Sequence, residues 1–213
     1  MHLNFILIFF FQYCLCHCQK NELKKDYLTE YPPPWKAESG LVEPFLVNLT
    51  FLIMSIPAID ELEQKIAIDT FYILNWRDER LEYNSTQLEP FSSDYKVFYG
   101  NKYPFWKPDL YITNLDHATS PKLLMETETY FVYPDGKVHY SKLVRFNFNC
   151  QMDFHMFPFD SQSCHMIVES WSYKNSQLKF NLNAQFINQK MILNQFYYSL
   201  EVGPESIATY TSG

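Results

Sequence analysis

Two cysteines enclose the segment CQMDFHMFPFDSQSC, residues 150–164, and a proline flanked by aromatic residues lies between them. In an exported chain, such a pair is typical of a disulfide. A disulfide here would close a loop of about 15 residues, which corresponds to about 3 kcal/mol in the chain-entropy model. The Phe157–Pro158 bond is a candidate cis peptide, because X-Pro bonds lose most of the preference for trans. Such a loop can be rigid without belonging to a sheet.

Residues 1–18, MHLNFILIFFFQYCLCHC, differ in composition from the rest of the chain. The run from Leu3 to Phe11 is apolar apart from Asn4, and it is too short to span a bilayer, which requires about 20 residues. Its length suits the apolar region of a secretory signal, although the basic residues that usually precede that region are missing. We predict a signal peptide there and a mature domain over residues 19–213; the alternative is a buried N-terminal strand.

Cleavage of the signal peptide would determine which cysteines remain in the mature chain. Cys14, Cys16 and Cys18 lie in or at the end of the predicted signal peptide. Cleavage leaves Cys150 and Cys164, plus Cys18 if the cut falls before it. An even pair in a secreted chain indicates a disulfide.

Two glycosylation sequons, NLT at Asn48 and NST at Asn84, agree with a secretory route. Asn84 lies in the polar stretch EYNSTQ and is the better acceptor, whereas Asn48 lies in a predicted strand. No later apolar run reaches membrane-spanning length, so the chain itself is expected to be a soluble exported domain.

Composition argues against several classes of function. The formal net charge is −7 and there is no basic run, which disfavours nucleic-acid binding. The chain has neither GxSxG nor HExxH, and with 5 glycines it has no phosphate-binding glycine loop, so we expect neither an enzyme nor a cofactor. The histidines lack the spacing of a metal site and are expected to be surface or half-buried residues: His117, His139, His155 and His165.

Alternation of apolar and polar residues predicts strands along most of the chain. The first strand starts after Pro44 and ends in a turn around residues 55–57; the second covers residues 66–76. A hairpin over residues 130–141 turns at Asp135-Gly136, and its second arm runs to Cys150. Further strands are expected over residues 164–171, 177–182 and 196–202.

The other segments are predicted from breaks in this pattern. Residues 20–30 have helical spacing and end at the triple proline 32–34, so a short N-terminal helix is expected there. Residues 77–110 are polar and interrupted by Pro90, Gly100, Pro104 and Pro108, as in loops. Trp76 and Trp106 are assigned to the core. The fold is predicted to be all-β, a twisted immunoglobulin-like sandwich of about ten strands with one short α-helix.

Four segments occur in an order that resembles a known family. They are WRDERL at residues 76–81, WKPDLYITN at residues 106–114, the cysteine segment with FPFD inside it, and ESWSY at residues 169–173. Together they resemble the extracellular ligand-binding domain of the Cys-loop receptors, which are pentameric ligand-gated ion channels. The resemblance extends from about residue 23 to the end. WRDERL is closer to the anion-selective branch of GABA, glycine, glutamate and histamine receptors, whereas FPFD is commoner in cation-selective members.

The resemblance implies a ligand site between neighbouring subunits of a homo- or hetero-pentamer. On its principal face it implies Tyr111, Glu169, Trp171, Tyr173 and Tyr210 as ligand-binding residues. Rings around a ligand cation each contribute on the order of 1–2 kcal/mol when desolvated, and the carboxylate adds an acceptor or counter-charge. The alternative is that these rings belong to the core.

On the complementary face the resemblance implies Phe71 and Ser141. Receptors for amino-acid transmitters place an arginine nearby to bind the ligand carboxylate in a bidentate manner, but here the corresponding positions are Ile73 and Phe131. We therefore expect an amine without a carboxylate, protons or another modulator rather than glutamate, glycine or GABA. Alternatively, the chain supplies only the principal face of a mixed pentamer.

The resemblance also implies that the loop Phe157-Pro158-Phe159-Asp160 and the turn at Pro57–Asp60 press on a membrane-embedded region. The sequence ends before the last strand and the membrane helices of the family, so it is expected to be a fragment or a truncated isoform. The full receptor would lie in the postsynaptic or plasma membrane, with this domain on the extracellular side. A secreted soluble protein of the acetylcholine-binding type is the second hypothesis, and a secreted immunoglobulin-type adhesion domain is the third.

Overall fold

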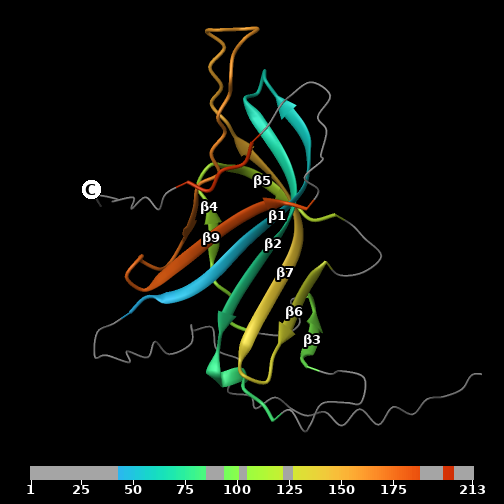
Figure 1. The fold of residues 1–213 in the computed structure, drawn as a ribbon, viewed down its shortest axis with the longest axis vertical. Helices are drawn as coiled ribbons and strands as arrows, with labels where there is room; N and C mark the ends of the chain where they lie inside the picture. Colours follow the sequence, from blue (N-terminus) through green and yellow to red (C-terminus); the bar gives the residue numbers. More distant parts are fainter. Residues whose placement is uncertain (1–42, 85–93, 101–104, 122–126, 188–198, 204–213) are drawn as a thin grey trace, which may run out of the picture.

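The computed structural model describes residues 43–84, 94–100, 105–121, 127–187 and 199–203. Its strands, in chain order, are β1 (Phe45–Asp60), β2 (Lys65–Arg77), β3 (Lys96–Tyr99), β4 (Leu110–Ile112), β5 (Leu115–Thr119), β6 (Glu128–Val132), β7 (Lys137–Asn149), β8 (Val168–Ser170) and β9 (Leu178–Phe186). The large sheet has the order β3-β6-β7-β2-β1-β9, and β5 pairs with β7. β4 and β8 form a second, two-stranded sheet; β4 passes behind β1 and β9 in Figure 1. The predicted all-β sandwich is confirmed.

The core lies between the large sheet and the small one, and it follows the predicted alternation. Each long strand directs every second side chain inward, since successive residues of a strand point to opposite faces. The buried hydrophobic residues that follow this alternation are Val47, Leu49, Phe51 and Ile53 of β1, Ile68, Leu74 and Trp76 of β2, and Val138, Tyr140, Val144, Phe146 and Phe148 of β7; Ala67 of β2, out of phase with them, is buried as well. Trp76 and Trp106 are 4% and 6% exposed and their rings meet edge to face, so their assignment to the core is confirmed.

The end of the first strand was predicted wrongly. β1 continues through Pro57 to Asp60, and the chain turns only at residues 61–64. The pairing with β2 shifts register between Ile53 and Ser55 and again between Ser55 and Ala58. A proline cannot donate to the strand ladder but is tolerated at such bulges. Pro57 therefore marks a bulge rather than a turn.

The β6–β7 hairpin has the predicted turn. Tyr133 donates its backbone N–H to Lys137 at 2.9 Å, and Gly136 donates back to Tyr133 at 3.0 Å. Gly136 has φ +77°, and a Cβ there would lie 2.7 Å from the carbonyl oxygen of Asp78. Both the left-handed conformation and the close approach require glycine at this turn.

Three other predictions need correction or fall outside the described residues. Residues 77–110 contain a 3-10 helix, Glu79–Leu81, and strand β3. In the run 164–171 only Val168–Ser170 is a strand, because only these residues pair with β4. The described part of the run 196–202 forms no strand, since it has no hydrogen-bonded partner strand. The expected helix over residues 20–30 lies outside the described residues. No helix in the described ranges is long and apolar enough to cross a membrane.

A buried carboxylate links three strands and the segment before β4. Glu128 of β6 is 8% exposed and accepts hydrogen bonds from Tyr140 at 3.0 Å, Lys142 at 3.2 Å and Lys107 at 3.3 Å. The hydroxyl of Tyr72 lies 2.9 Å from that of Tyr140, and burial raises the pKa of Tyr72 to about 12. Burial disfavours the charged form of Glu128, but the two ammonium groups outweigh burial, so its pKa lies below the usual range.

We predict that acid destabilises the fold through this carboxylate. Because the pKa of Glu128 is lower in the folded state, its contribution is complete at neutral pH and is lost as pH falls below about 4.5 through the folded pKa. The pKa of Asp69, lowered by Arg145, acts in the same direction. Denaturant unfolding followed by tryptophan fluorescence between pH 7 and pH 3 measures the effect.

The matched variant is Glu128→Gln. At neutral pH it should lower the free energy of unfolding by about 1–3 kcal/mol, because it replaces the buried carboxylate that accepts from both lysines with a neutral, weaker acceptor. It should also reduce the acid dependence. An unchanged pH dependence in this variant would show that other carboxylates cause the acid effect.

Candidate functional site

The short β4–β8 ladder brings together residues that are far apart in sequence. Tyr111 of β4 lies directly opposite Glu169 of β8 in the antiparallel register. Trp171 follows β8, and its ring centroid lies 5.0 Å from that of Tyr111 at an interplanar angle of 66°. Trp171 is 74% exposed. Three residues predicted for the principal face therefore form one surface cluster.

Asp109 holds this cluster in shape, and sequence reasoning did not single it out. Its carboxylate accepts a hydrogen bond from Ser170 Oγ at 2.6 Å and one from the backbone N–H of Ser172 at 2.6 Å. Ser170 Oγ in turn accepts the N–H of Tyr173 at 3.0 Å. These bonds tie the residues on both sides of Trp171 to the segment before Tyr111. The sequence feature that could have pointed to Asp109 is its position as an acidic residue between Pro108 and a strand.

Glu169 is oriented by a hydroxyl of the residue that follows β4. Thr113 Oγ1 donates to Glu169 Oε1 at 2.8 Å. A carboxylate beside two aromatic rings, with part of its surface in contact with solvent, can attract a cation to the rings. The chemistry of the cluster is therefore that of a cation-binding surface.

The other two residues predicted for the principal face are not shown as part of this exposed cluster. Tyr173 is partly buried and packs against the hydrophobic core, so the alternative of a core aromatic applies to it in part. Tyr210 lies outside the described residues.

The residues predicted for the complementary face lie on the outward side of the large sheet. Phe71 of β2 and Ser141 of β7 belong to neighbouring rows: Phe71 pairs with Leu143, and Ser141 pairs with Ile73. All of these side chains are half-buried, on the side opposite to the core residues of the same strands. Ile73 and Phe131, the positions without arginine, also lie on this outward face.

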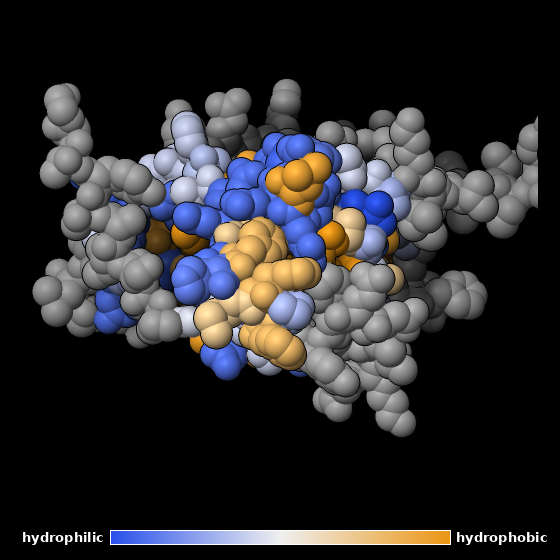
Figure 2. Space-filling model, turned by 90° about the horizontal axis from the view of Figure 1, so that it is seen from above, coloured by the Kyte–Doolittle hydropathy of each residue, from blue (hydrophilic) through white to orange (hydrophobic). Residues whose placement is uncertain are grey.

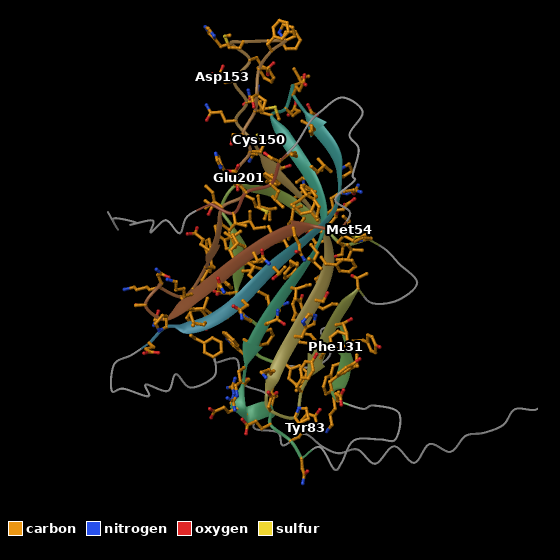
Figure 3. All side chains as sticks on the ribbon, in the orientation of Figure 1. Met54, Tyr83, Phe131, Cys150, Asp153 and Glu201 are labelled. Carbon is orange, nitrogen blue, oxygen red and sulfur yellow. A yellow bond between two sulfur atoms is a disulfide. The ribbon has the colours of Figure 1, made fainter. Side chains whose placement is uncertain are left out.

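The cysteine loop projects from one end of the sandwich (Figure 1). The Cys150–Cys164 disulfide is present and the Phe157–Pro158 bond is cis, as predicted. Gln162 crosses the loop, accepting from the N–H of Asp153 at 2.8 Å and donating to its carbonyl at 2.7 Å. In Figure 3, Asp153 lies beyond Cys150 toward the tip of the loop.

The tip of this loop is apolar and exposed. Phe157 and Phe159 are 70% and 90% exposed, and Leu62 in the β1–β2 turn is 91% exposed. Cys150 N–H donates to the carbonyl of Gln64 at 2.8 Å, so the base of the loop is tied to the β1–β2 turn. Figure 2, viewed from this end, shows apolar surface bordered by hydrophilic residues.

The two sequon asparagines are both exposed but differ in setting. Asn48 lies within β1, and its Oδ1 accepts a hydrogen bond from Asn181 of β9 at 2.9 Å. Asn84 follows the 3-10 helix, and the rest of its sequon lies outside the described residues. Among the residues that the structure covers, no group of His, Cys, Asp or Glu could hold a metal ion.

Comparisons with known proteins match this arrangement. A family model described as "Neurotransmitter-gated ion-channel ligand binding domain" matches residues 20–211. The chain is 29% identical over 158 residues to "Gamma-aminobutyric acid receptor subunit theta" of Mus musculus, covering 73% of this chain and 24% of that protein. It is 28% identical over 174 residues to "Gamma-aminobutyric acid receptor subunit rho-3" of Homo sapiens, covering 79% and 36%.

A nematode protein is also similar. The chain is 28% identical over 158 residues to "Ligand-gated ion channel 4" of Caenorhabditis briggsae, covering 74% of this chain and 24% of that protein. The chain thus spans between a quarter and about a third of the length of these relatives. The GABA receptor matches agree with the branch that WRDERL predicted.

Proposed function

The chain belongs to the family of neurotransmitter-gated ion-channel ligand-binding domains, and we propose that it is the extracellular part of a channel subunit that binds a small ligand between neighbouring subunits of a pentamer. The observation that carries this proposal is the cluster of Tyr111, Glu169 and Trp171. Its rings lie 5.0 Å apart beside a carboxylate, and Trp171 is exposed as a contact residue must be. A matched channel family favours this function over a soluble binding protein.

We propose an amine without a carboxylate as the ligand class. The principal cluster offers ring faces and a negative charge, which attract a cation. The complementary face has Ile73 and Phe131 where an arginine would bind a ligand carboxylate, and neither can do so. The relatives named as GABA receptor subunits point to a ligand with both charges, but this chain has groups for only the cationic end. If it takes part in a GABA site, it would supply the principal face of a mixed pentamer.

The cysteine loop is the part proposed to transmit ligand binding. Phe157 and Phe159 form an apolar tip at one end of the sandwich. The backbone hydrogen bond from Cys150 N–H to the carbonyl of Gln64 ties the base of the loop to the β1–β2 turn. The coupling element of the first strand is accordingly the turn at residues 61–64 rather than Pro57–Asp60. In the proposed receptor both elements contact the membrane domain, since exposed apolar patches of this kind mark interaction sites.

The secretory features complete the proposal. Residues 1–18 serve as a signal peptide, residues 19–213 belong to the ligand-binding domain, and Asn84 and Asn48 carry glycans. The receptor lies in the plasma membrane with this domain outside the cell. Its assembly is homomeric or includes related subunits.

The test is expression of the receptor that contains this chain, alone and together with GABA receptor subunits, with membrane currents recorded. We expect currents in response to monoamines and weak or no response to GABA in the homomer. A homomer that responds to GABA and not to amines would refute the proposed ligand class. The absence of any current, with receptor at the cell surface, would contradict the channel function of the homomer.

A further inference from the structure

One imidazole on the outward face of the large sheet has an unused hydrogen-bond acceptor. His139 of β7 lies opposite Asn75 of β2 and opposite Phe131 of β6. It is two residues from Ser141 on the same face, a separation of about 7 Å along a strand. His139 is therefore adjacent to the residues of the candidate complementary face. Figure 3 shows Phe131 on the β6 side of the sheet, far from Cys150.

The hydrogen bond to Asn75 determines where the imidazole carries its proton. His139 Nδ1 lies 2.7 Å from Asn75 Oδ1. An amide oxygen only accepts, so Nδ1 must donate, and in the neutral ring Nε2 is then the acceptor. Within the described residues, Nε2 has no hydrogen-bond partner. Burial lowers the pKa of His139, which keeps the ring neutral at pH 7.

One aromatic ring packs beside this imidazole, and further rings extend from it. The Phe131 ring lies 5.5 Å from the imidazole at 66°. The ring of Tyr95, just before β3, lies 5.3 Å from that of Phe131 and 5.6 Å from that of Tyr133, just after β6, so the rings continue away from His139. This row, consisting of His139, Phe131, Tyr95 and Tyr133, presents aromatic surface next to one half-buried acceptor.

The charged residues nearest in the sheet do not disturb this setting. Arg77 of β2 and Lys137 of β7 form the next row on this face. Arg77 pairs with Glu82 at 3.0 Å, and Lys137 pairs with Asp135 at 2.7 Å. Each of these two cations thus has its own carboxylate, so neither adds an unbalanced positive charge beside His139.

We propose that His139 is a specificity-determining residue of the complementary face, whose Nε2 accepts a hydrogen bond from an N–H of the ligand's ammonium group. The inference rests on the proposed function, because it assumes that the facing subunit supplies Trp171 and Glu169. It adds a selectivity that cation–π contacts alone do not provide. Rings attract any cation, but only an ammonium that retains a hydrogen can donate to the imidazole. The site therefore prefers primary, secondary and tertiary amines to quaternary ones.

The experiment compares 2-phenylethylamine with its N,N,N-trimethyl analogue on the full-length receptor. The two probes share the ring and the charge, and only the first has N–H donors. Half-maximal concentrations are measured for activation, or for displacement of the best agonist. The wild type should favour the primary amine by about tenfold, the size of a hydrogen bond to a charged group.

His139→Leu should abolish this preference, and His139→Gln should retain part of it because its amide oxygen can accept. His165→Leu, which alters an exposed histidine near the cysteine loop, is the matched control and should keep the full preference. Surface labelling shows that each variant is assembled.

The role of His139 and the amine ligand class can fail separately. A preference that is the same in wild type and His139→Leu overturns the role of His139 while leaving an amine site in place. If neither probe binds the wild type, the amine class itself is wrong, and this inference fails with it.

Discussion

Replacing Trp171 by alanine is expected to raise the ligand concentration for half-maximal response by about 30-fold or more, the loss typical of a tryptophan at the centre of an interface. The indole lies 5.0 Å from Tyr111 and beside Glu169, and in the single chain it is 74% exposed. A large exposed ring contributes little to the fold of its own chain. We therefore expect the loss in ligand response without a loss of folded receptor. Concentration–response curves with surface labelling measure both.

Two further variants separate the physical contributions of the ring. Trp171→Phe keeps a π face with a weaker quadrupole and should fall between wild type and alanine. Trp171→Leu keeps apolar volume without a π face and should resemble alanine. If leucine matches the wild type, the contact is hydrophobic and the ligand need not be a cation. If alanine has no effect, Trp171 is not part of the site.

Removing the Cys150–Cys164 disulfide is expected to lower the free energy of unfolding by about 3 kcal/mol, since it releases a closed loop of about 15 residues in the unfolded chain. The double variant Cys150→Ala with Cys164→Ala avoids an unpaired thiol. Cys150 is buried and its N–H bonds to Gln64, so loosening the loop base should also weaken the link to the β1–β2 turn. Denaturant unfolding gives the stability, and receptor currents give the coupling.

The matched control keeps the disulfide and removes the internal bonds of the loop. Gln162→Ala loses two hydrogen bonds to Asp153 and one to the Asp160 carboxylate, and because the bonds to Asp153 are exposed and that to Asp160 is only partly buried it should cost less than the disulfide, about 1.5 kcal/mol. If the double cysteine variant unfolds at the wild-type denaturant concentration, the disulfide does not stabilise the domain. If Gln162→Ala reduces currents as much as the cysteine variant does, loop shape rather than covalent closure is what coupling requires.

Much of the sandwich could be predicted because alternation is a local property. The alternating apolar residues of β1, β2 and β7 are buried as expected, since a strand with one buried face must place every second side chain inward. The hairpin at Gly136 was likewise readable, because the turn demands a residue that adopts positive φ. Pro57 was misread because a bulge depends on the partner strand, which local sequence does not reveal.

The residues of the candidate site were named from motifs, but their grouping came from the fold. Tyr111 and Glu169 are far apart in sequence and meet only because β4 pairs with β8. Asp109 was overlooked because its role depends on Ser170 and Ser172, which approach it through that same pairing. Tyr173 was grouped with exposed rings, although it packs against the core.

By itself, the sequence determined the all-β class, the closed cysteine loop and the types of residue available for binding a cation, because these follow from periodicity, spacing and side-chain chemistry. Only the tertiary structure decided that Tyr111, Glu169 and Trp171 share one surface, that Glu128 is neutralised by two lysines, and that His139 turns an acceptor outward beside Phe131. These depend on strand pairing and register, which bring distant residues together and set which side of the sheet each one occupies.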